Sequence, residues 1–263
     1  MQTTSDTIST NILDQRNSTT KPTRYWEIDT VRGVAIILMV FYHLMWDLNY
    51  FGVVTLNMLS GPWQWFARSI ATMFIVVLGI SLVVSTAHSD RSRLFPKFFL
   101  RGTKIFGLGL IITMATYFFL GQGFVIFGIL HLLGFSIVAA YPFMPYSWRY
   151  LTLITGLILI GLGIYLDSQV SSTPWLIWLG LKQSGRFMVD YYPVLPWFGL
   201  ALVGVYVGHT LYANGVSRLI LPDKSQTLLI RELSFLGRHS LLIYIVHQPL
   251  LIGLLILLGV GAV

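Results

Sequence analysis

The chain contains no cysteine and few charged residues. Without cysteine it has no disulfide, no thiolate nucleophile and no zinc–thiolate site. Asp, Glu, Lys and Arg make up 10% of its 263 residues, whereas a typical soluble domain holds about 25%. So few charges cannot cover a globule of this length, so lipid must face much of the surface. The composition therefore predicts an all-α, polytopic transmembrane helix bundle.

Apolar runs of about 20 residues, long enough to cross a bilayer, recur along the chain. About seven spans are predicted, at 28–48, 63–86, 98–120, 123–145, 149–167, 196–214 and 240–262. The stretch 174–181 is apolar but too short, so we expect an interfacial or re-entrant segment there. Residues 1–24 are polar and lack the apolar core of a signal peptide. They are predicted to be a disordered cytoplasmic tail, followed by a single transmembrane domain over 25–263.

The distribution of Lys and Arg predicts the orientation. With the N-terminus in the cytoplasm, the outer loops hold only Lys182 and Arg186, and Arg68 lies within a span. The net charge of +7 then comes from basic residues clustered in the cytoplasmic loops, as membrane topology requires. No nucleic acid is therefore expected as a partner. The sequence predicts an integral membrane protein, with the lipid bilayer as a partner and a homodimer left open.

Four polar residues of the first span fall on one stripe. An α-helix turns by about 100° per residue, so Asp29 and Asp47 are separated by about five full turns and about 27 Å, with Arg32 and His43 on the same side. The spacing of His43 and Asp47 would let the carboxylate orient the imidazole. The alternatives are an interfacial cap and anchor for Asp29 and Arg32, and a helix–helix hydrogen bond for His43.

Two further ionisable residues lie in the same outer half of the predicted bundle. Arg68 is one to two turns from the outer end of the second span, and His131 is about two turns into the fourth. Ionisable groups at this depth are costly and often functional. We therefore take His43, Asp47, Arg68 and His131 as the candidate catalytic residues. Snorkelling of Arg68 to the interface and a structural role for His131 are the alternatives.

The candidate substrate-binding residues come from two later segments. Arg186, Asp190 and Trp197 lie in or beside an aromatic-rich outer loop, where they would suit a sugar-binding rim or an aromatic belt. Tyr244 and His247 share one face of the last span with Ser240 and Gln248, which would also suit bonds between helices. No set of ligands at metal-site spacing is present, so no metal is expected.

The opening segment resembles a known family. The run from Arg24 to Ile36, followed by His43, resembles the first helix of the heparan-α-glucosaminide N-acetyltransferase catalytic-domain family, which belongs among the transmembrane acyltransferases. Three further stretches support the resemblance. They are Phe127–His131, Asp190–Pro193 with Pro196–Gly199, and Leu236–Leu241 with Tyr244, His247 and Pro249.

The resemblance implies an acyltransferase of a bacterial plasma (inner) membrane. It would move an acetyl group from cytosolic acetyl-CoA to an amino sugar or glycan acceptor at or across that membrane. His43 would be the general base or acyl carrier, so activity should rise with pH through the histidine range. Related surface-glycan acyltransferases share the spacing of Arg32 and His43. The donor would be held by inner groups, namely Asp29, Arg32, Arg101 and Lys104.

One departure from the family and two other functions remain open. The animal enzyme has Asn at the position of His43 and its catalytic histidine slightly later, whereas here no histidine follows until His88. Buried His, Asp and Arg also suit a proton-coupled transporter, although no clear inverted repeat is visible. A non-catalytic membrane scaffold is the third alternative.

Overall fold

The structure is a computed structural model that describes residues 25–87, 89–171, 173–185, 187–212 and 216–260. Within these ranges the regular elements are α-helices and short 3-10 turns, with one isolated β-bridge between Val170 and Lys182. The predicted all-α class is confirmed. The predicted tail, residues 1–24, lies outside the described residues.

In the described part of the chain, six helices are long and apolar enough to cross a membrane. They are α2 (Trp26–Tyr50), α3 (Gly61–Ala87), α4 (Arg91–Leu120), α6 (Arg149–Asp167, entered through a 3-10 turn at Tyr146–Trp148), α7 (Val194–Leu211) and α9 (Ser240–Leu257). Each coincides with a predicted span, because a long apolar run can satisfy its backbone within lipid only as a helix.

The helix within the fourth predicted span, 123–145, is shorter than expected. The span holds only α5 (Ile129–Ala139), of 11 residues, and a 3-10 turn at Tyr141–Phe143. Such a helix rises about 16 Å, roughly half the hydrocarbon core of a bilayer. Gly121 and Gly123 have φ of 62° and 84°, values that do not continue a helix. The number of crossings and the orientation therefore remain predictions.

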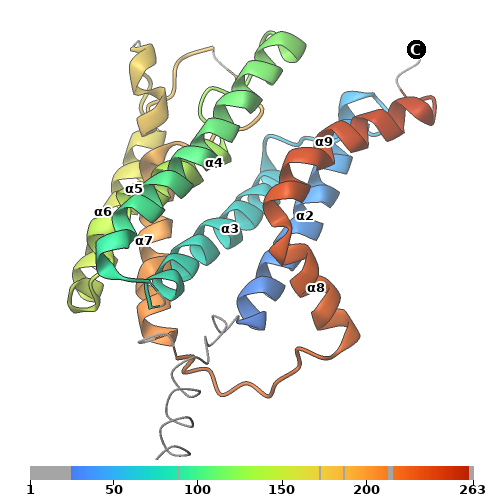
Figure 1. The fold of residues 1–263 in the computed structure, drawn as a ribbon. Helices are drawn as coiled ribbons and strands as arrows, with labels where there is room; N and C mark the ends of the chain where they lie inside the picture. Colours follow the sequence, from blue (N-terminus) through green and yellow to red (C-terminus); the bar gives the residue numbers. More distant parts are fainter. Residues whose placement is uncertain (1–24, 88, 172, 186, 213–215, 261–263) are drawn as a thin grey trace, which may run out of the picture.

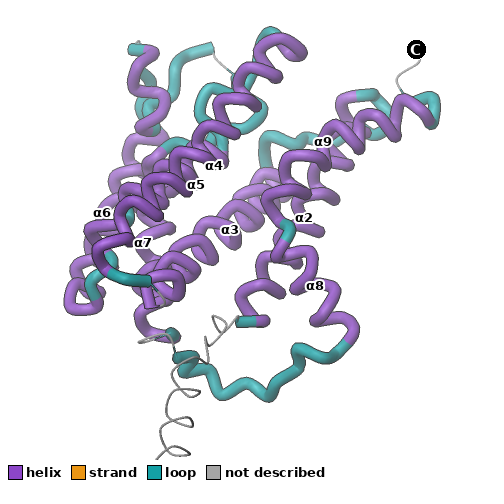
Figure 2. Tube along the Cα trace, in the orientation of Figure 1, coloured by secondary structure: helices purple, strands orange, loops and turns teal. Residues whose placement is uncertain are grey.

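Helix α3 lies between two groups of helices (Figure 1). It packs against α7 on one side and against α2 on the other. Helices α4 to α7 form the first group, with α4 against α5 and α6 against α7. Helices α2, α8 (Leu228–Arg238) and α9 form the second. Figure 2 shows that loops join these helices mainly at the two ends of the bundle.

Glycines allow the closest helix contacts. The sequence spacing of Gly204 and Gly208 suggests such contacts. A Cβ atom on Gly204 would collide with the carbonyl oxygen of Val76, and one on Gly208 would lie 3.0 Å from Val83. At the other interface, a Cβ atom on Gly237 of α8 would collide with the Asp29 carbonyl of α2. These approaches fix α3 against α7 and α8 against α2.

A break in the helix separates α8 from the apolar helix α9. Helix α8 ends at Arg238, and His239 has φ −99° and ψ 13°, after which α9 begins. Helix α9 then packs along α2, and both run toward the upper right of Figure 1. The predicted interfacial segment 174–181 contains a 3-10 helix, Pro174–Leu179, that buries Ile177.

Candidate active site

The C-terminal half of α2 meets α9 through polar side chains. Asp47 is 3% exposed, and its Oδ1 accepts a hydrogen bond from Nε2 of Gln248 at 2.6 Å. The ring of His43 lies edge-on to that of His247, with centroids 4.8 Å apart. The expected hydrogen bond between Asp47 and His43 is not formed in the described part of the chain. Helix α9 instead supplies each of them with a neighbour.

Three buried polar atoms at this interface have no hydrogen-bond partner among the described residues. They are Asp47 Oδ2, His247 Nε2 and Gln248 Oε1, and we call these three residues the acceptor cluster. His247 Nδ1 lies 2.7 Å from the carbonyl oxygen of Tyr244. That nitrogen must donate, so the Nε2 of a neutral His247 can only accept. The cluster therefore suits a ligand that donates hydrogen bonds.

Asp190 brings the segment before α7 to the same region. Its Oδ2 accepts a hydrogen bond from the backbone N–H of Ile129, the first residue of α5, at 3.0 Å. Burial raises the pKa of Asp190 to about 6, although this hydrogen bond acts in the opposite direction. The carboxyl group interacts electrostatically with Tyr42, Tyr192 and Tyr244. Helices α2 and α9 thus approach Asp190 through their tyrosines.

Arg68 of α3 lies at the edge of this tyrosine group. Its guanidinium is 5.5 Å from the centre of the Trp65 ring, and it interacts electrostatically with Tyr192. Among the described residues Arg68 forms no ion pair with Asp47, whose Oδ1 accepts the hydrogen bond from Gln248. A cation beside Tyr192 is placed to attract negative charge near Asp190 and the tyrosines.

His131 belongs to a different environment. It is 1% exposed, with its ring stacked on Phe127 and edge-on to Phe106. Its Nδ1 accepts a hydrogen bond from the Gly128 N–H at 3.2 Å, and its Nε2 lies 3.4 Å from the hydroxyl of Thr113. Both ring nitrogens are therefore occupied between α4 and α5. These hydrogen bonds hold the start of α5, and the place of His131 among the catalytic residues stays a prediction.

The other predicted substrate-binding residues are only partly brought together. Tyr244 and His247 lie on α9 beside the acceptor cluster. The ring of Trp197 packs edge-on against Tyr192, with centroids 4.9 Å apart, and thereby supports the tyrosine that faces Asp190. Arg186 lies outside the described residues.

The N-terminal end of α2 forms a basic centre with α3 and α4. Arg32 bonds to Asp29 Oδ1 at 3.0 Å and to the Ser81 hydroxyl at 2.8 Å. The positive charges of Arg101 on α4 and of Arg32 repel each other electrostatically. Lys104 is exposed one turn further along α4. Two guanidinium groups held near each other form a site suited to phosphate groups.

Sequence reasoning did not select Tyr42, Tyr192 or Gln248 as site residues. Tyr42 directly precedes His43, and Gln248 directly follows His247. Tyr42 and Gln248 are thus sequence neighbours of candidate histidines, and Tyr192 follows Asp190 by two residues. Nearness in sequence to a candidate residue was the available signal. In the described residues, no group of three or more His, Asp or Glu side chains is placed to hold a metal ion.

Comparison with known proteins gives one family. No curated protein and no solved structure matches the chain significantly. The family model described as "Heparan-alpha-glucosaminide N-acetyltransferase, catalytic" matches residues 24–249. The match runs from the start of α2 into α9 and includes every element of the acceptor cluster and of the basic centre. It confirms the resemblance seen in the sequence, and the chain therefore belongs to the heparan-α-glucosaminide N-acetyltransferase catalytic family.

Proposed function

We propose that this protein transfers an acetyl group from acetyl-CoA to the primary amine of an amino sugar or glycan, at or across a bacterial plasma membrane. Family membership and the six apolar helices make it a membrane acetyltransferase. The donor, the acceptor and the residue roles rest on one observation. A single helix, α2, carries the basic centre at one end and His43 beside the acceptor cluster at the other.

The basic centre is the proposed donor site. Arg32 and Arg101 would bind phosphate groups of CoA through charge-assisted hydrogen bonds, and Lys104 would add a third cation. Asp29 and Ser81 hold the Arg32 guanidinium, so their role is to position it. His43 lies eleven residues beyond Arg32, a rise of about 16 Å along the helix. An extended donor bound at one end can thus present its thioester near the other.

The transfer makes one bond and breaks one. The acceptor nitrogen attacks the thioester carbonyl carbon, the C–N bond forms, and the C–S bond breaks to release CoA. His43 takes a proton from the attacking nitrogen, and the CoA sulfur leaves as a thiol after protonation. Alternatively, His43 attacks first, carries the acetyl group on its imidazole and passes it to the amine. Arg68 would stabilise the negative charge that develops on the carbonyl oxygen.

The acceptor cluster favours an amine over a hydroxyl. Asp47, His247 and Gln248 offer only acceptor atoms at their unpartnered positions. An amino group has at least two N–H donors, whereas a hydroxyl has one. A buried acceptor that stays unpaired is costly, so a ligand with more donors is selected. Asp190, Tyr244, Trp197 and Arg186 would contact the sugar around this amine.

The test uses the protein in lipid nanodiscs with labelled acetyl-CoA. Glucosamine and glucose are compared as acceptors, because they differ in the amine alone. We expect label on glucosamine, loss of transfer in His43→Ala, and retention in His239→Ala, a matched variant at an exposed histidine. Equal labelling of glucose would contradict the preference for an amine, and full activity of His43→Ala would contradict the catalytic role of His43. Release of CoA in one turnover without acceptor would identify His43 as the carrier.

A further inference from the structure

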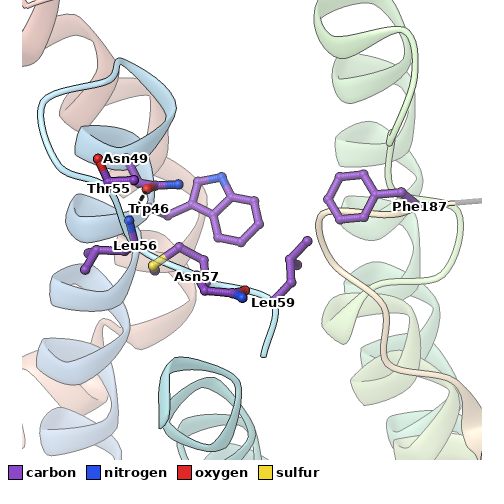
Figure 3. A pocket seen from close by; sticks show the side chains of 8 residues that line it. Trp46, Asn49, Thr55, Leu56, Asn57, Leu59 and Phe187 are labelled. Atoms are coloured by element: carbon purple, nitrogen blue, oxygen red, sulfur yellow. Dashed lines mark hydrogen bonds between the residues drawn. The ribbon is translucent and has the colours of Figure 1, made fainter. Parts of the chain in front are cut away.

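Helix α2 has different neighbours at its two ends. At its C-terminal end it lines a cavity of about 580 Å³, where the ring of Trp46 is directed toward that of Phe187 (Figure 3). The centroid of the Tyr42 ring lies 6.3 Å from that of Trp46 and 5.7 Å from that of His43, so this cavity adjoins the acceptor cluster. The N-terminal end is covered by α8 instead. Neither α8 nor the residues before it take part in the proposed acetyl transfer.

Residues 216–238, which we call the α8 segment, carry exposed apolar side chains outside the membrane-length helices. Residues 216–227 run along the end of the bundle at which α2 begins (Figure 1). Ile220 is fully exposed, and so is most of the surface of Leu228 and Leu229. Helix α8 has 11 residues and rises about 16 Å, too little to cross a bilayer. Apolar groups exposed at this position suit the boundary between headgroups and acyl chains.

Four exposed cations accompany these apolar groups, namely Arg218, Lys224, Arg231 and Arg238. The two carboxylates of the segment are engaged locally. Glu232 pairs with Arg231 at 3.1 Å, and Asp223 accepts a hydrogen bond from the backbone N–H of Ser225 at 2.9 Å. Within the described residues the other three cations form no ion pair. The segment therefore presents a net charge of +2 beside its apolar side chains.

On α8 the cations and the apolar groups form two neighbouring rows. Leu228 and Phe235 are seven residues apart, which is about two turns, and so are Arg231 and Arg238. At about 100° per residue the two rows lie about 60° apart around the helix. A helix that lies at a membrane surface has this pattern, because its apolar row enters the acyl boundary while the long basic side chains reach the headgroups.

Another side of α8 is fastened to the first turns of α2. The hydroxyl oxygens of Thr30 and Ser234 lie 3.0 Å apart, and Ser234 is buried. A Cβ atom on Gly33 of α2 would collide with the carbonyl oxygen of Leu233. This close packing leaves α8 little freedom to turn its exposed rows inward. Whatever surface binds these rows is therefore held beside the N-terminal end of α2.

We propose that the α8 segment binds the anionic phospholipid headgroups of the bilayer that holds the protein. Ile220, Leu228 and Phe235 enter the acyl boundary, and the cations contact lipid phosphates. Charge complementarity favours this partner, since each Lys or Arg near an anionic membrane surface adds about fivefold to its affinity. A zwitterionic surface lacks that net charge, and an apolar protein surface would leave the cations without counter-ions.

The first test measures insertion with a polarity-sensitive fluorophore on a single introduced cysteine, because the chain has none of its own. Ile220→Cys is labelled and placed in nanodiscs of phosphatidylcholine, with or without an equal share of phosphatidylglycerol. We expect the label to be shielded from acrylamide, an aqueous quencher, much more strongly in the anionic nanodiscs. High salt should weaken this difference. Gln169→Cys, at an exposed polar residue after α6, is the control and should stay accessible in both.

The second test asks whether these particular cations are responsible. Native mass spectrometry of the protein in a neutral detergent, titrated with phosphatidylglycerol, measures the affinity. The double variant Arg218→Gln with Lys224→Gln should bind this lipid about 25-fold more weakly, at about fivefold for each cation. Arg91→Gln with Arg93→Gln is the matched control, because it removes two exposed cations at the start of α4. It should leave the affinity nearly unchanged.

Three outcomes would overturn the proposal. A label at residue 220 that is shielded equally in neutral and anionic nanodiscs would show that the headgroup charge has no role. A label that stays accessible in both would exclude contact with the membrane and favour an acidic protein as the partner. Equal weakening by the two double variants would show that total charge decides and not the α8 segment. None of these measurements uses acetyl transfer, so they stand whether or not the proposed function holds.

Discussion

The environments of His43 and His131 differ in how completely their polar groups are satisfied. Around His131, both ring nitrogens have partners and two phenylalanine rings enclose the imidazole. Around His43 and its neighbour His247, three buried acceptor atoms have no partner in the described chain. Buried polar groups are normally hydrogen-bonded, so exceptions call for a ligand or a role. The first environment stabilises the fold, and the second is suited to bind a substrate.

Replacing His43 by Ala should have the largest effect. Loss of a general base costs about 10²–10⁴ in rate, so acetyl transfer should fall by that factor while the melting temperature changes little. Transfer is measured with labelled acetyl-CoA, and the melting temperature by thermal unfolding in nanodiscs. Full transfer by a folded His43→Ala variant would count against His43 as the base.

Replacing His131 by Ala should give the opposite pattern. The Gly128 N–H would lose its hydrogen-bond acceptor, and Phe106 and Phe127 would lose the ring that packs between them. The expected loss in unfolding free energy is about 2–4 kcal/mol. Thermal unfolding in nanodiscs measures this loss. Activity per folded molecule should stay within about threefold of the wild type, well below the cost of a lost catalytic group. A rate loss as large as that of His43→Ala, with stability intact, would place His131 among the catalytic residues.

Replacing Asp47 by Asn should act on acceptor binding. The amide can still accept the hydrogen bond from Gln248, but the cluster loses its negative charge and with it the stronger, charge-assisted bond to an amine. We expect KM for glucosamine to rise about tenfold and KM for acetyl-CoA to stay unchanged. If both constants rise together, Asp47 maintains the packing of α2 on α9 and does not contact the acceptor.

Replacing Asp190 by Asn should have the smallest effect, and it should depend on pH. Burial raises the pKa of Asp190 to about 6, so the folded protein holds this proton after the unfolded chain has released it. The contribution of Asp190 to stability is therefore full below its usual pKa and is lost as pH rises to about 6. The variant should melt about 2–4 °C above the wild type at pH 7.5 and at the same temperature near pH 4. A variant less stable at pH 7.5 would show that the charged form is the favoured one.

Hydropathy predicted the helices well but could not show where they meet. Six predicted spans are helices, because lipid leaves an apolar run no other way to satisfy its backbone. The fourth was predicted too long, since apolar residues continue through the glycine-rich loop before α5 and the turns after it. Sequence spacing also suggested that Asp47 orients His43. In the structure Asp47 Oδ1 instead accepts a hydrogen bond from Gln248, because α9 packs along α2.

The sequence by itself determined the helical class, the family and the polar stripe on α2, because periodicity and local motifs are properties of one segment. Only the tertiary structure decided which polar faces meet. It placed His247 against His43, drew Asp190 to the tyrosines of α2 and α9, and enclosed His131 between α4 and α5. These pairings depend on contacts between segments far apart in the chain. Close packing at glycines such as Gly237 sets those contacts, and no single segment encodes them.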